Sequence, residues 1–541
     1  MSQSTRRSEV ATDIAVDTAA AATAAAAEAA ASTPRDTAAP AVIASDSASP
    51  FVPTGPASAI LPRPDNGVPV KVFGTPAIRG GLDAGCLRQA LNCAMAPGIS
   101  QVVLNPDAHV GYGAPIGCVM SSPSHIYPGP IGVDIKCSMS LLALDLDEDA
   151  IADPRVRREL IKAICRRTPT GTGRQRRKVE PGRTVGPELG RQAVTEGASA
   201  GVCAALGVPE AWAERCEDAQ HFAADGSVDG LRERLDVLMQ DKRFAERFPG
   251  KIRQFGTYGG GNHFGECEVV RVHDSDRART LADAFGLREG GVAFLSHCGS
   301  RGLGNDLATG QFRALKAHFD RWGIPLPGGD RHMVHAPLGS PEADAYIADM
   351  SIGANFATVN HMVINALVLE AFQEVLPGTT GELVYLISHN IARPEIVGGR
   401  LEWVHRKGAT RAFPAGHPGL RGTPFADTGH PILLPGDPQA GSAVMVADAG
   451  AVESCYSVNH GAGRTMSRTA AKKALDQQAV DASFAAKDIL TNSRQYPLDE
   501  APAAYKDFEE VLRSVKEAGL ASEVARLDAR FVIKDGDKAD D

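Results

Sequence analysis

Residues 383–390 read Leu-Val-Tyr-Leu-Ile-Ser-His-Asn, and this stretch gives the strongest indication of the fold. Its first five residues form a short continuous apolar run, which is typical of a buried β-strand. The run leads directly into Ser388, His389 and Asn390. Functional side chains concentrate where a rigid element meets a loop. A histidine at the end of a buried strand is therefore a candidate for ligand binding or chemistry.

Three further apolar runs lie next to polar motifs and also predict buried strands, at residues 102–104, 141–144 and 293–295. Apolar spacing and good helix formers predict helices over residues 208–224, 276–287, 342–376 and 469–488. No long Pro/Gly/Ser linker interrupts the chain between Val70 and about Lys534. We therefore expect an α+β fold: a single large domain, residues 67–536, with mixed and antiparallel sheets surrounded by helices.

The two ends of the chain differ from this domain in composition. Residues 1–66 are rich in Ala, Ser, Thr and Pro and contain almost no aromatic residues. Such a segment offers too little apolar contact to offset the entropy of ordering the chain, so we expect it to be disordered. Residues 537–541 form a short charged C-terminal tail.

The bulk composition excludes some classes of protein. Of 541 residues, 43% are apolar and 22% charged, which is the balance of a globular protein. The net charge of −9 does not give the basic field of a nonspecific nucleic-acid coat protein. No run approaches the ~18 consecutive apolar residues of a membrane span. The ten scattered cysteines fit a reducing compartment. We expect a cytoplasmic protein that does not enter a membrane.

One stretch, from Arg166 to Arg183, is strongly basic. A charge run of this kind favours a solvated surface. Contact with nucleic-acid phosphates, which would make binding sensitive to salt, is the alternative.

Five side chains are candidates for binding divalent metal: Asp134, Cys137, His263, His297 and His389. Asp134 and Cys137 are three residues apart in Gly-Val-Asp-Ile-Lys-Cys, so a carboxylate and a thiolate can converge on one ion. Imidazole suits Mn, Fe, Ni, Cu and Zn alike, so the ligands do not choose the metal. Taken singly, each motif also fits a structural role, such as a capping Asp beside a buried Cys.

His460 lies among small residues in Val-Asn-His-Gly-Ala-Gly-Arg, residues 458–464. Small neighbours would let a phosphate approach the imidazole while backbone N–H groups and Arg464 bind its oxygens. A glycine-rich helix N-terminus is the alternative. The glycines at 259–261 likewise permit close approach of a ligand, or form a turn that ends a strand.

Taken together and in this order, these motifs resemble the RtcB family of RNA-splicing ligases. The resemblance runs from about Val70 to Lys534 and rests on PDAHVGYGAPIG at 106–117, GVDIKC at 132–137, GNHFGE at 261–266, SHCGSRGLG at 296–304, HRKGATRAFP at 405–414, HGAGRTMSR at 460–468 and DEAPAAYKD at 499–507.

The resemblance implies an enzyme that joins RNA ends with a 2′,3′-cyclic phosphate or 3′-phosphate to 5′-hydroxyl ends, using GTP and two manganese ions. It implies that Asp134, Cys137 and His263 hold one ion and that Cys137, His297 and His389 hold the other. His460 would be the catalytic nucleophile that carries GMP. The implied partners are these RNA ends and GTP, and an activating protein is left open.

The resemblance also implies a guanylate site made of Asn262, His263, Glu266, His389, Asn390, Asp437, Ser442, His460, Gly461, Ala462, Gly463 and Lys534. The sequence departs from the family pattern in this region. Asp437 stands where the family usually has serine, and Asp535 is inserted after Lys534. Lys136 and Ser138 replace small residues beside Cys137, and residues 192–216 fit the pattern poorly.

Two other functions remain as alternatives. A metal-dependent RNA-end phosphoesterase would use the same metal cluster with activated water, and Asp437 is the sequence feature that favours it. A non-catalytic RNA-binding subunit would use the metal for structure, but the presence of all five ligand candidates together with His460 argues against that reading.

Overall fold

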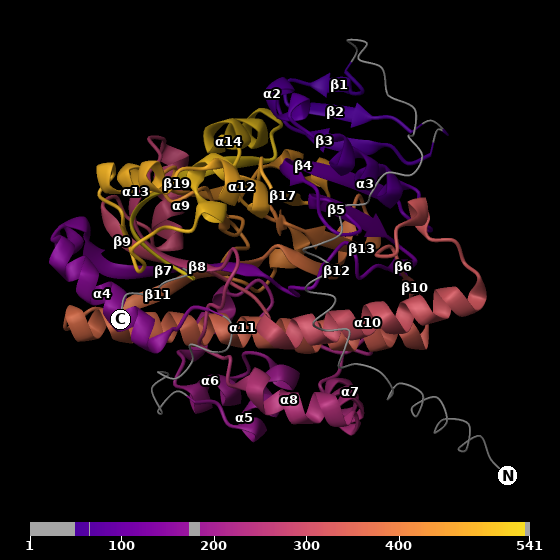
Figure 1. The fold of residues 1–541 in the computed structure, drawn as a ribbon, viewed down its shortest axis with the longest axis horizontal. Coiled ribbons are helices and arrows are strands. Elements are labelled where there is room, and N and C mark those ends of the chain that lie inside the picture. Colours follow the sequence, from indigo (N-terminus) through magenta and orange to yellow (C-terminus); the bar gives the residue numbers. More distant parts are fainter. Residues whose placement is uncertain (1–48, 64, 66, 172–183, 536–541) are drawn as a thin grey trace.

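Two large β-sheets organise the chain, and a long buried helix passes beneath them (Figure 1). The computed structural model describes residues 49–535 apart from residues 64, 66 and 172–183. Within this range the fold is α+β with mixed and antiparallel sheets in one domain, as the sequence predicts. The N-terminal segment before residue 49 and the tail at 537–541 lie outside the described residues.

The first sheet runs in the order β11-β7-β9-β8-β19-β16-β15, and a short strand, β18, pairs with β19. Apart from the parallel β18–β19 pair, its neighbouring strands are antiparallel. Its strands are β7 (Ser138–Asp147), β8 (Phe264–Val272), β9 (Gly291–Cys298), β11 (Gly381–Ser388), β15 (Ile432–Pro435), β16 (Ser442–Ala447), β18 (Leu490–Thr491) and β19 (Ala521–Lys534). The apolar runs at 141–144, 293–295 and 383–387 all lie in this sheet, so the predicted strands there are confirmed.

The second sheet runs in the order β1-β2-β3-β4-β5-β13-β12, with β3 and β4 parallel and the other pairs antiparallel. Its strands are β1 (Val52–Gly55), β2 (Ser58–Leu61), β3 (Val70–Phe73), β4 (Gln101–His109), β5 (Ile116–Ser122), β12 (Asn390–Val397) and β13 (Arg400–Lys407). The run at 102–104 lies in β4, as predicted. Two small pairs complete the strands: β6 (His125–Ile126) with β10 (Ala336–Pro337), and β14 (Ala409–Arg411) with β17 (Ser457–Asn459).

Helix α11 (Pro341–Val375) is the centre of the largest hydrophobic core. Ser340 caps its start by accepting a hydrogen bond from the N–H of Ala343, and Pro341 suits the first turn. By length and composition α11 could cross a bilayer, but 94% of its most apolar window is buried inside the protein. Its apolar surface is therefore used for packing against neighbouring helices and against β7, β9 and β11.

The remaining helices cover the sheets and α11. Figure 1 places α10 alongside α11 and places α5 to α8 on the far side of that pair from the sheets. They are α2 (Pro76–Gly80), α3 (Ala84–Ala94), α4 (Pro154–Arg167), α5 (Pro187–Glu196), α6 (Ala200–Leu206), α7 (Asp229–Gln240), α8 (Lys242–Ile252), α9 (Asp276–Phe285), α10 (Arg301–Trp322), α12 (Arg468–Ala474), α13 (Gln477–Ala486) and α14 (Phe508–Glu517).

Two predicted helices, over 276–287 and 342–376, are confirmed as α9 and α11. The helix predicted over 208–224 is wrong, because only a 3₁₀ turn forms at Glu210–Arg215. Beyond it the chain is drawn along β11, where Cys216 bridges to Leu386. The helix predicted over 469–488 is divided into α12 and α13, because Leu475 is extended.

The boundary of the expected N-terminal tail also needs correction. Residues 52–61 form β1 and β2, and β2 pairs with β3 from Ser58 opposite Phe73 to Leu61 opposite Val70. Alternate side chains of β2 are buried against the sheet, so this short stretch gains the apolar contact that its composition alone does not suggest.

Candidate active site

The five metal-ligand candidates meet where strands of the two sheets begin and end. Cys137 directly precedes β7, His263 directly precedes β8, and His297 lies in β9 opposite Met139 of β7 and Phe264 of β8. His389 is the single residue between β11 of the first sheet and β12 of the second. Its backbone N–H donates to the carbonyl of Cys137 at 2.9 Å. Strand register therefore brings together residues that are far apart in sequence.

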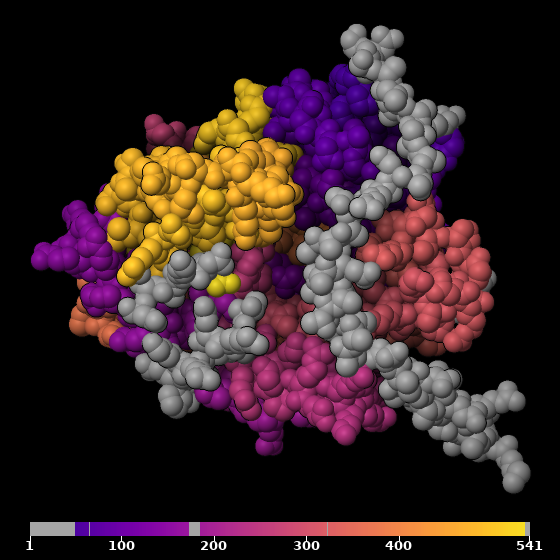
Figure 2. Space-filling view, in the orientation of Figure 1, coloured from indigo at the N-terminus to yellow at the C-terminus, as the bar shows by residue number. Residues whose placement is uncertain are grey.

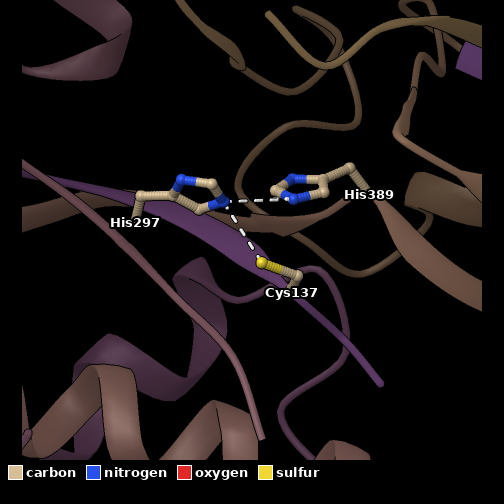
Figure 3. Close-up of side chains that lie close together, drawn as sticks. All are labelled: Cys137, His297 and His389. Atoms are coloured by element: carbon tan, nitrogen blue, oxygen red, sulfur yellow. Dashed lines mark hydrogen bonds between the residues drawn. The ribbon is translucent and has the colours of Figure 1, made fainter. Parts of the chain in front are cut away.

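The ligand atoms form two groups that share Cys137: Asp134, Cys137 and His263, and Cys137, His297 and His389. In each group the atoms lie within 4.8 Å of one another. Figure 3 shows the second group, with both imidazoles directed toward each other and the thiol below them. Cys137 Sγ lies 3.1 Å from His297 Nε2, and His297 Nε2 lies 3.3 Å from His389 Nε2. In the first group, His263 Nε2 lies 2.9 Å from Asp134 Oδ2.

Backbone carbonyls hold the imidazoles of His263 and His297 on the side away from the ligand groups. His263 Nδ1 lies 2.9 Å from the carbonyl of Tyr258, and His297 Nδ1 lies 3.1 Å from the carbonyl of Asn262. A carbonyl only accepts, so both Nδ1 atoms donate, and His297 Nε2 presents a lone pair to the centre. Such outer partners are the usual support of metal-binding histidines. His263 Nε2 also faces the Asp134 carboxylate, and the charges of Cys298, Cys137 and Asp134 raise the pKa of His263 well above its usual range against the effect of burial.

The protonation states favour metal binding. Burial lowers the pKa of His297 and of His389 well below the usual range, so both imidazoles are neutral ligands near pH 7. Burial and the nearby charge of Asp134 raise the pKa of the Cys137 thiol. His263 opposes this shift, and a bound cation would stabilise the Cys137 thiolate further. The donor set therefore fits divalent metal, with no preference among Mn, Fe and Zn.

A glycine makes room for the carboxylate ligand. A Cβ at Gly299 would lie 2.3 Å from Asp134 Oδ1, so any larger residue would displace this side chain. Gly299 follows β9 directly, and Asn390 Nδ2 donates to the carbonyl of Asp134 at 3.3 Å. The loop before Cys137 is thereby held by both sheets.

His460 lies beside the second group, with its ring centroid 5.0 Å from that of His389. The carboxylate of Asp107, a buried residue of β4, accepts from the backbone N–H of His460 at 3.1 Å. The same oxygen lies 2.5 Å from His460 Nδ1. Because this carboxylate oxygen accepts, Nδ1 of His460 carries the proton and Nε2 keeps a lone pair, as a nucleophile requires. Asp107 lies in the motif at 106–117, but the sequence predicts no role for it.

The residues after His460 make a close-packed turn. Gly463 has φ of 74°, and a Cβ there would lie 2.3 Å from the carbonyl of Asp107. Glycine at this position therefore allows β4 and the His460 loop to touch. Asn459 Nδ2 donates to the carbonyl of Gly461 at 2.8 Å, and Ala462 is buried. The segment predicted to cradle phosphate is a preformed turn.

Glu266 and Lys534 lie at the paired ends of β8 and β19. Lys534 Nζ lies 3.0 Å from Glu500 Oε2 and 5.7 Å from the centre of the Phe264 ring. Glu266 is buried, and its Oε1 atom has no hydrogen-bond partner in the described part of the chain. Burial and the nearby charge of Asp437 raise the pKa of Glu266 to about 8, against the opposing effect of Lys534.

The other guanylate candidates lie around these two residues. Asp437 begins the turn from β15 to β16 and accepts from the N–H groups of Gln439 and Ala440. Ser442 begins β16, and its hydroxyl donates to Glu268 at 2.7 Å. Asn262 is exposed at the rim. Asp437 thus lies near enough to Glu266 for its charge to act on that carboxyl, and Ser442 binds the same strand, β8, through Glu268.

A buried cation beside the metal cluster was not predicted. Lys136 is fully buried with φ of 51°, and its Nζ donates to the carbonyl of Asp218 at 2.7 Å and to Thr358 Oγ1 at 2.6 Å. His221 Nε2 lies 2.8 Å from the same nitrogen. Lys136 thus ties the loop before Cys137 to α11. The substitution of a small residue by lysine is accommodated by this pocket.

Three of the basic residues suggested for phosphate contact, Arg166, Arg167 and Arg464, lie in the described part of the chain, and all three bind other groups of the protein. Arg166 and Arg167 both pair with Glu374. The rest of the basic stretch from residue 172 onward lies outside the described residues. Arg464 donates to the carbonyls of Met466 and Asp499 and is thereby committed to holding the turn after His460.

Figure 2 shows a hollow near the centre of the face that carries α12 and α13, above the magenta helices α7 and α8. The side chains described above define a candidate metal-binding site in which a carboxylate-held histidine stands beside two groups of possible ligands that share a cysteine.

Comparison with known proteins identifies the family. The family model described as "tRNA-splicing ligase RtcB" matches residues 89–535. The chain is 34% identical over 464 residues to the "tRNA-splicing ligase RtcB" of Thermococcus kodakarensis, covering 83% of this chain and 90% of that protein. It is 36% identical to that of Archaeoglobus fulgidus over 84% of this chain and 92% of that protein. It is 35% identical to the "RNA-splicing ligase RtcB" of Mycobacterium tuberculosis, over 81% and 98%. The chain belongs to the RtcB family.

Proposed function

We propose that the chain is a GTP- and manganese-dependent RNA ligase that joins RNA 3′-phosphate or 2′,3′-cyclic phosphate ends to 5′-hydroxyl ends through a covalent His460–GMP intermediate. Membership of the RtcB family supports RNA ligase chemistry. The single observation that supports the histidine route is the pairing of His460 with Asp107 beside the ligand group of His389.

Asp134, Cys137 and His263 would hold one ion and Cys137, His297 and His389 the other. Two bound ions would neutralise phosphate charge and orient phosphate oxygens. Gly461 to Gly463 offer a tight turn beside the imidazole, which gives the α-phosphate of GTP access to Nε2. Lys534 and Glu266 would hold the nucleoside, as the family resemblance implies.

The chemistry follows from the state of His460. Its Nε2 lone pair attacks the α-phosphorus of GTP, a P–N bond forms, and pyrophosphate leaves with the electrons of the broken P–O bond. Asp107 stabilises the positive charge that develops on the ring. An oxygen of the RNA 3′-phosphate then attacks the same phosphorus and breaks the P–N bond. The 5′-hydroxyl finally attacks the activated 3′-phosphate, loses its proton to solvent, and releases GMP. A cyclic phosphate must first be opened by water.

Incubation with Mn²⁺ and α-labelled GTP tests the proposal. We expect an acid-labile labelled adduct on the protein that His460→Ala lacks and that a surface control, His273→Ala, retains. Absence of any adduct on the unaltered chain overturns the proposal. Release of phosphate from a 3′-phosphorylated RNA without an adduct would support the alternative, a metal-dependent RNA-end phosphoesterase on the same scaffold.

A further inference from the structure

A small apolar patch is exposed beside the site. Among the large hydrophobic side chains of the described residues, Val110, Tyr112 and Val133 are 47%, 60% and 41% exposed. Single exposed apolar residues are common on protein surfaces. These three, however, belong to the two segments that carry the site: Val110 and Tyr112 follow β4, which contains Asp107, and Val133 precedes Asp134.

Two contacts place the Tyr112 loop next to His460. It leaves β4 just after Asp107, the residue that binds His460. Its backbone carbonyl accepts a hydrogen bond from the Nζ of the buried Lys407. Lys407 is followed by Gly408, and a Cβ at Gly408 would lie 3.0 Å from His460 Nδ1. A side chain on this short loop therefore stands at the rim of the site.

The loop is rigid as well as exposed. Gln89 holds Gly111 at both backbone atoms, accepting from its N–H at 3.0 Å and donating to its carbonyl at 2.7 Å. Ala114 N–H donates to the carbonyl of Tyr112 at 2.8 Å. The Tyr112 ring leans on His332, with centroids 6.0 Å apart and planes at 56°. An aromatic ring held in place loses little entropy when a ligand stacks on it.

The charges around the loop suit an anionic strand. Arg88 and Arg331 are exposed, and neither has an ion pair within residues 49–535 as far as these are described. A Cβ at Gly85 would lie 2.9 Å from Asp83 Oδ1, 3.2 Å from Val110 and 3.9 Å from Arg88, so this guanidinium lies near Val110, with the Asp83 carboxylate beside it. Arg331 adjoins His332, although Asp330 also lies there and pairs with that histidine. An exposed aromatic flanked by unpaired arginines is the arrangement that binds single-stranded nucleic acid.

We propose that Tyr112 is a stacking platform for an unpaired base of the RNA strand near the end that is joined, with Arg88 and Arg331 contacting its phosphates. The inference rests on the proposed function for its RNA substrate and adds a subsite to it. Stacking accepts any base, so the subsite favours single-stranded over duplex ends without reading sequence.

Binding of a fluorescent single-stranded 10-mer RNA with a 3′-phosphate, measured by anisotropy with Mn²⁺ and without GTP, tests the subsite. We expect Tyr112→Ala to weaken binding about 5- to 100-fold, the usual range for one stacked base, and Tyr112→Phe to bind as the unaltered protein does. Leu401→Ala is the matched control, since Leu401 is 62% exposed but lies at the opposite end of β13 from Lys407.

Removing bases one at a time from the 10-mer locates the contact. One abasic position should weaken binding to the unaltered protein and have no further effect on Tyr112→Ala. Equal affinity of Tyr112→Ala and the unaltered protein for all these RNAs overturns the inference. Labelling by GTP needs no RNA, so Tyr112→Ala should form the His460 adduct at the normal rate. Adduct formation tests the ligase proposal and RNA binding tests the subsite, so failure of one can be distinguished from failure of the other.

Discussion

The carboxylate of Asp107 binds His460 at two points, the backbone N–H at 3.1 Å and the ring Nδ1 at 2.5 Å. The two residues are separated by 353 positions in the chain, and Asp107 is completely buried. One side chain thus sets both the position of the histidine backbone and the tautomer of its ring.

Asp107→Asn is expected to slow formation of the GMP adduct by about 10²- to 10⁴-fold, the usual worth of such a proton-holding partner. The amide can turn its NH₂ group toward Nδ1, which would move the ring proton to the attacking Nε2. The GTP concentration for half-maximal rate and the metal content should not change, because Asp107 belongs to neither ligand group. Asp225→Asn, on an exposed turn, is the control. A rate within threefold of normal would contradict this role for Asp107.

Cys137→Ala is expected to weaken Mn²⁺ binding at both groups, since Cys137 is the one residue they share. Loss of an outer partner of a ligand costs about 10–100-fold in affinity, so loss of the ligand itself should cost at least ~100-fold. His389→Ala should weaken only one of the two bound ions. Titration calorimetry measures the number and affinity of bound Mn²⁺ ions in both variants. Cys267→Ala, which removes another buried cysteine of the same sheet, is the control. Retention of two tight ions by Cys137→Ala would rule out the shared ligand.

Asp437→Ser is expected to tighten GTP binding by roughly tenfold, or ~1.4 kcal/mol, because it removes a negative charge near Glu266 and the proposed nucleotide site. Equilibrium binding of GTP to His460→Ala, which cannot be labelled, isolates this effect from catalysis. A parallel titration with ATP shows whether Asp437 also alters the choice of base. Unchanged or weaker GTP affinity in Asp437→Ser would mean that this carboxylate does not oppose the nucleotide.

The raised pKa of Glu266 predicts that the stability of the protein depends on pH. Burial and the charge of Asp437 raise its pKa in the folded protein to about 8, from an ordinary value of 4.5. Between these values the folded state binds more protons than the unfolded state, so the free energy of unfolding falls as pH rises, by at most ~1.4 kcal/mol per pH unit. Glu266→Gln cannot ionise, so its stability should fall less steeply from pH 5 to pH 8.

Melting temperatures over this range measure the difference between Glu266→Gln and the unaltered protein. The exposed Glu188→Gln serves as the control. Parallel curves for Glu266→Gln and the unaltered protein would show that Glu266 is ionised throughout.

Much of the site could be predicted because its ligands directly adjoin recognisable strands. The run at 383–387 predicts β11, and the motif after it supplies His389. The family resemblance implies that Cys137 is shared by one group with His263 and another with His297, and the strand register of β7, β8 and β9 explains why these residues meet.

Features that depend on distant partners could not be predicted. Asp107 has no local signal, because its partner arrives from β17 at the other end of the chain. The sequence does not predict that Lys136 is buried, because the residues that enclose it come from α11 and from residues 218–221. Residues 208–224 contain helix formers, but pairing of Cys216 and Glu217 with β11 overrides their local preference.

The position of α11 in the chain determines which parts of the protein are synthesised before and after it. Four helices that pack against it, α4, α5, α7 and α10, precede it in the chain, so these partners are already synthesised when its 35 residues emerge. His389 and His460 are made only afterwards. A nascent chain that ends just after α11 therefore contains the first candidate ligand group and part of the second, but neither His389 nor the proposed nucleophile His460.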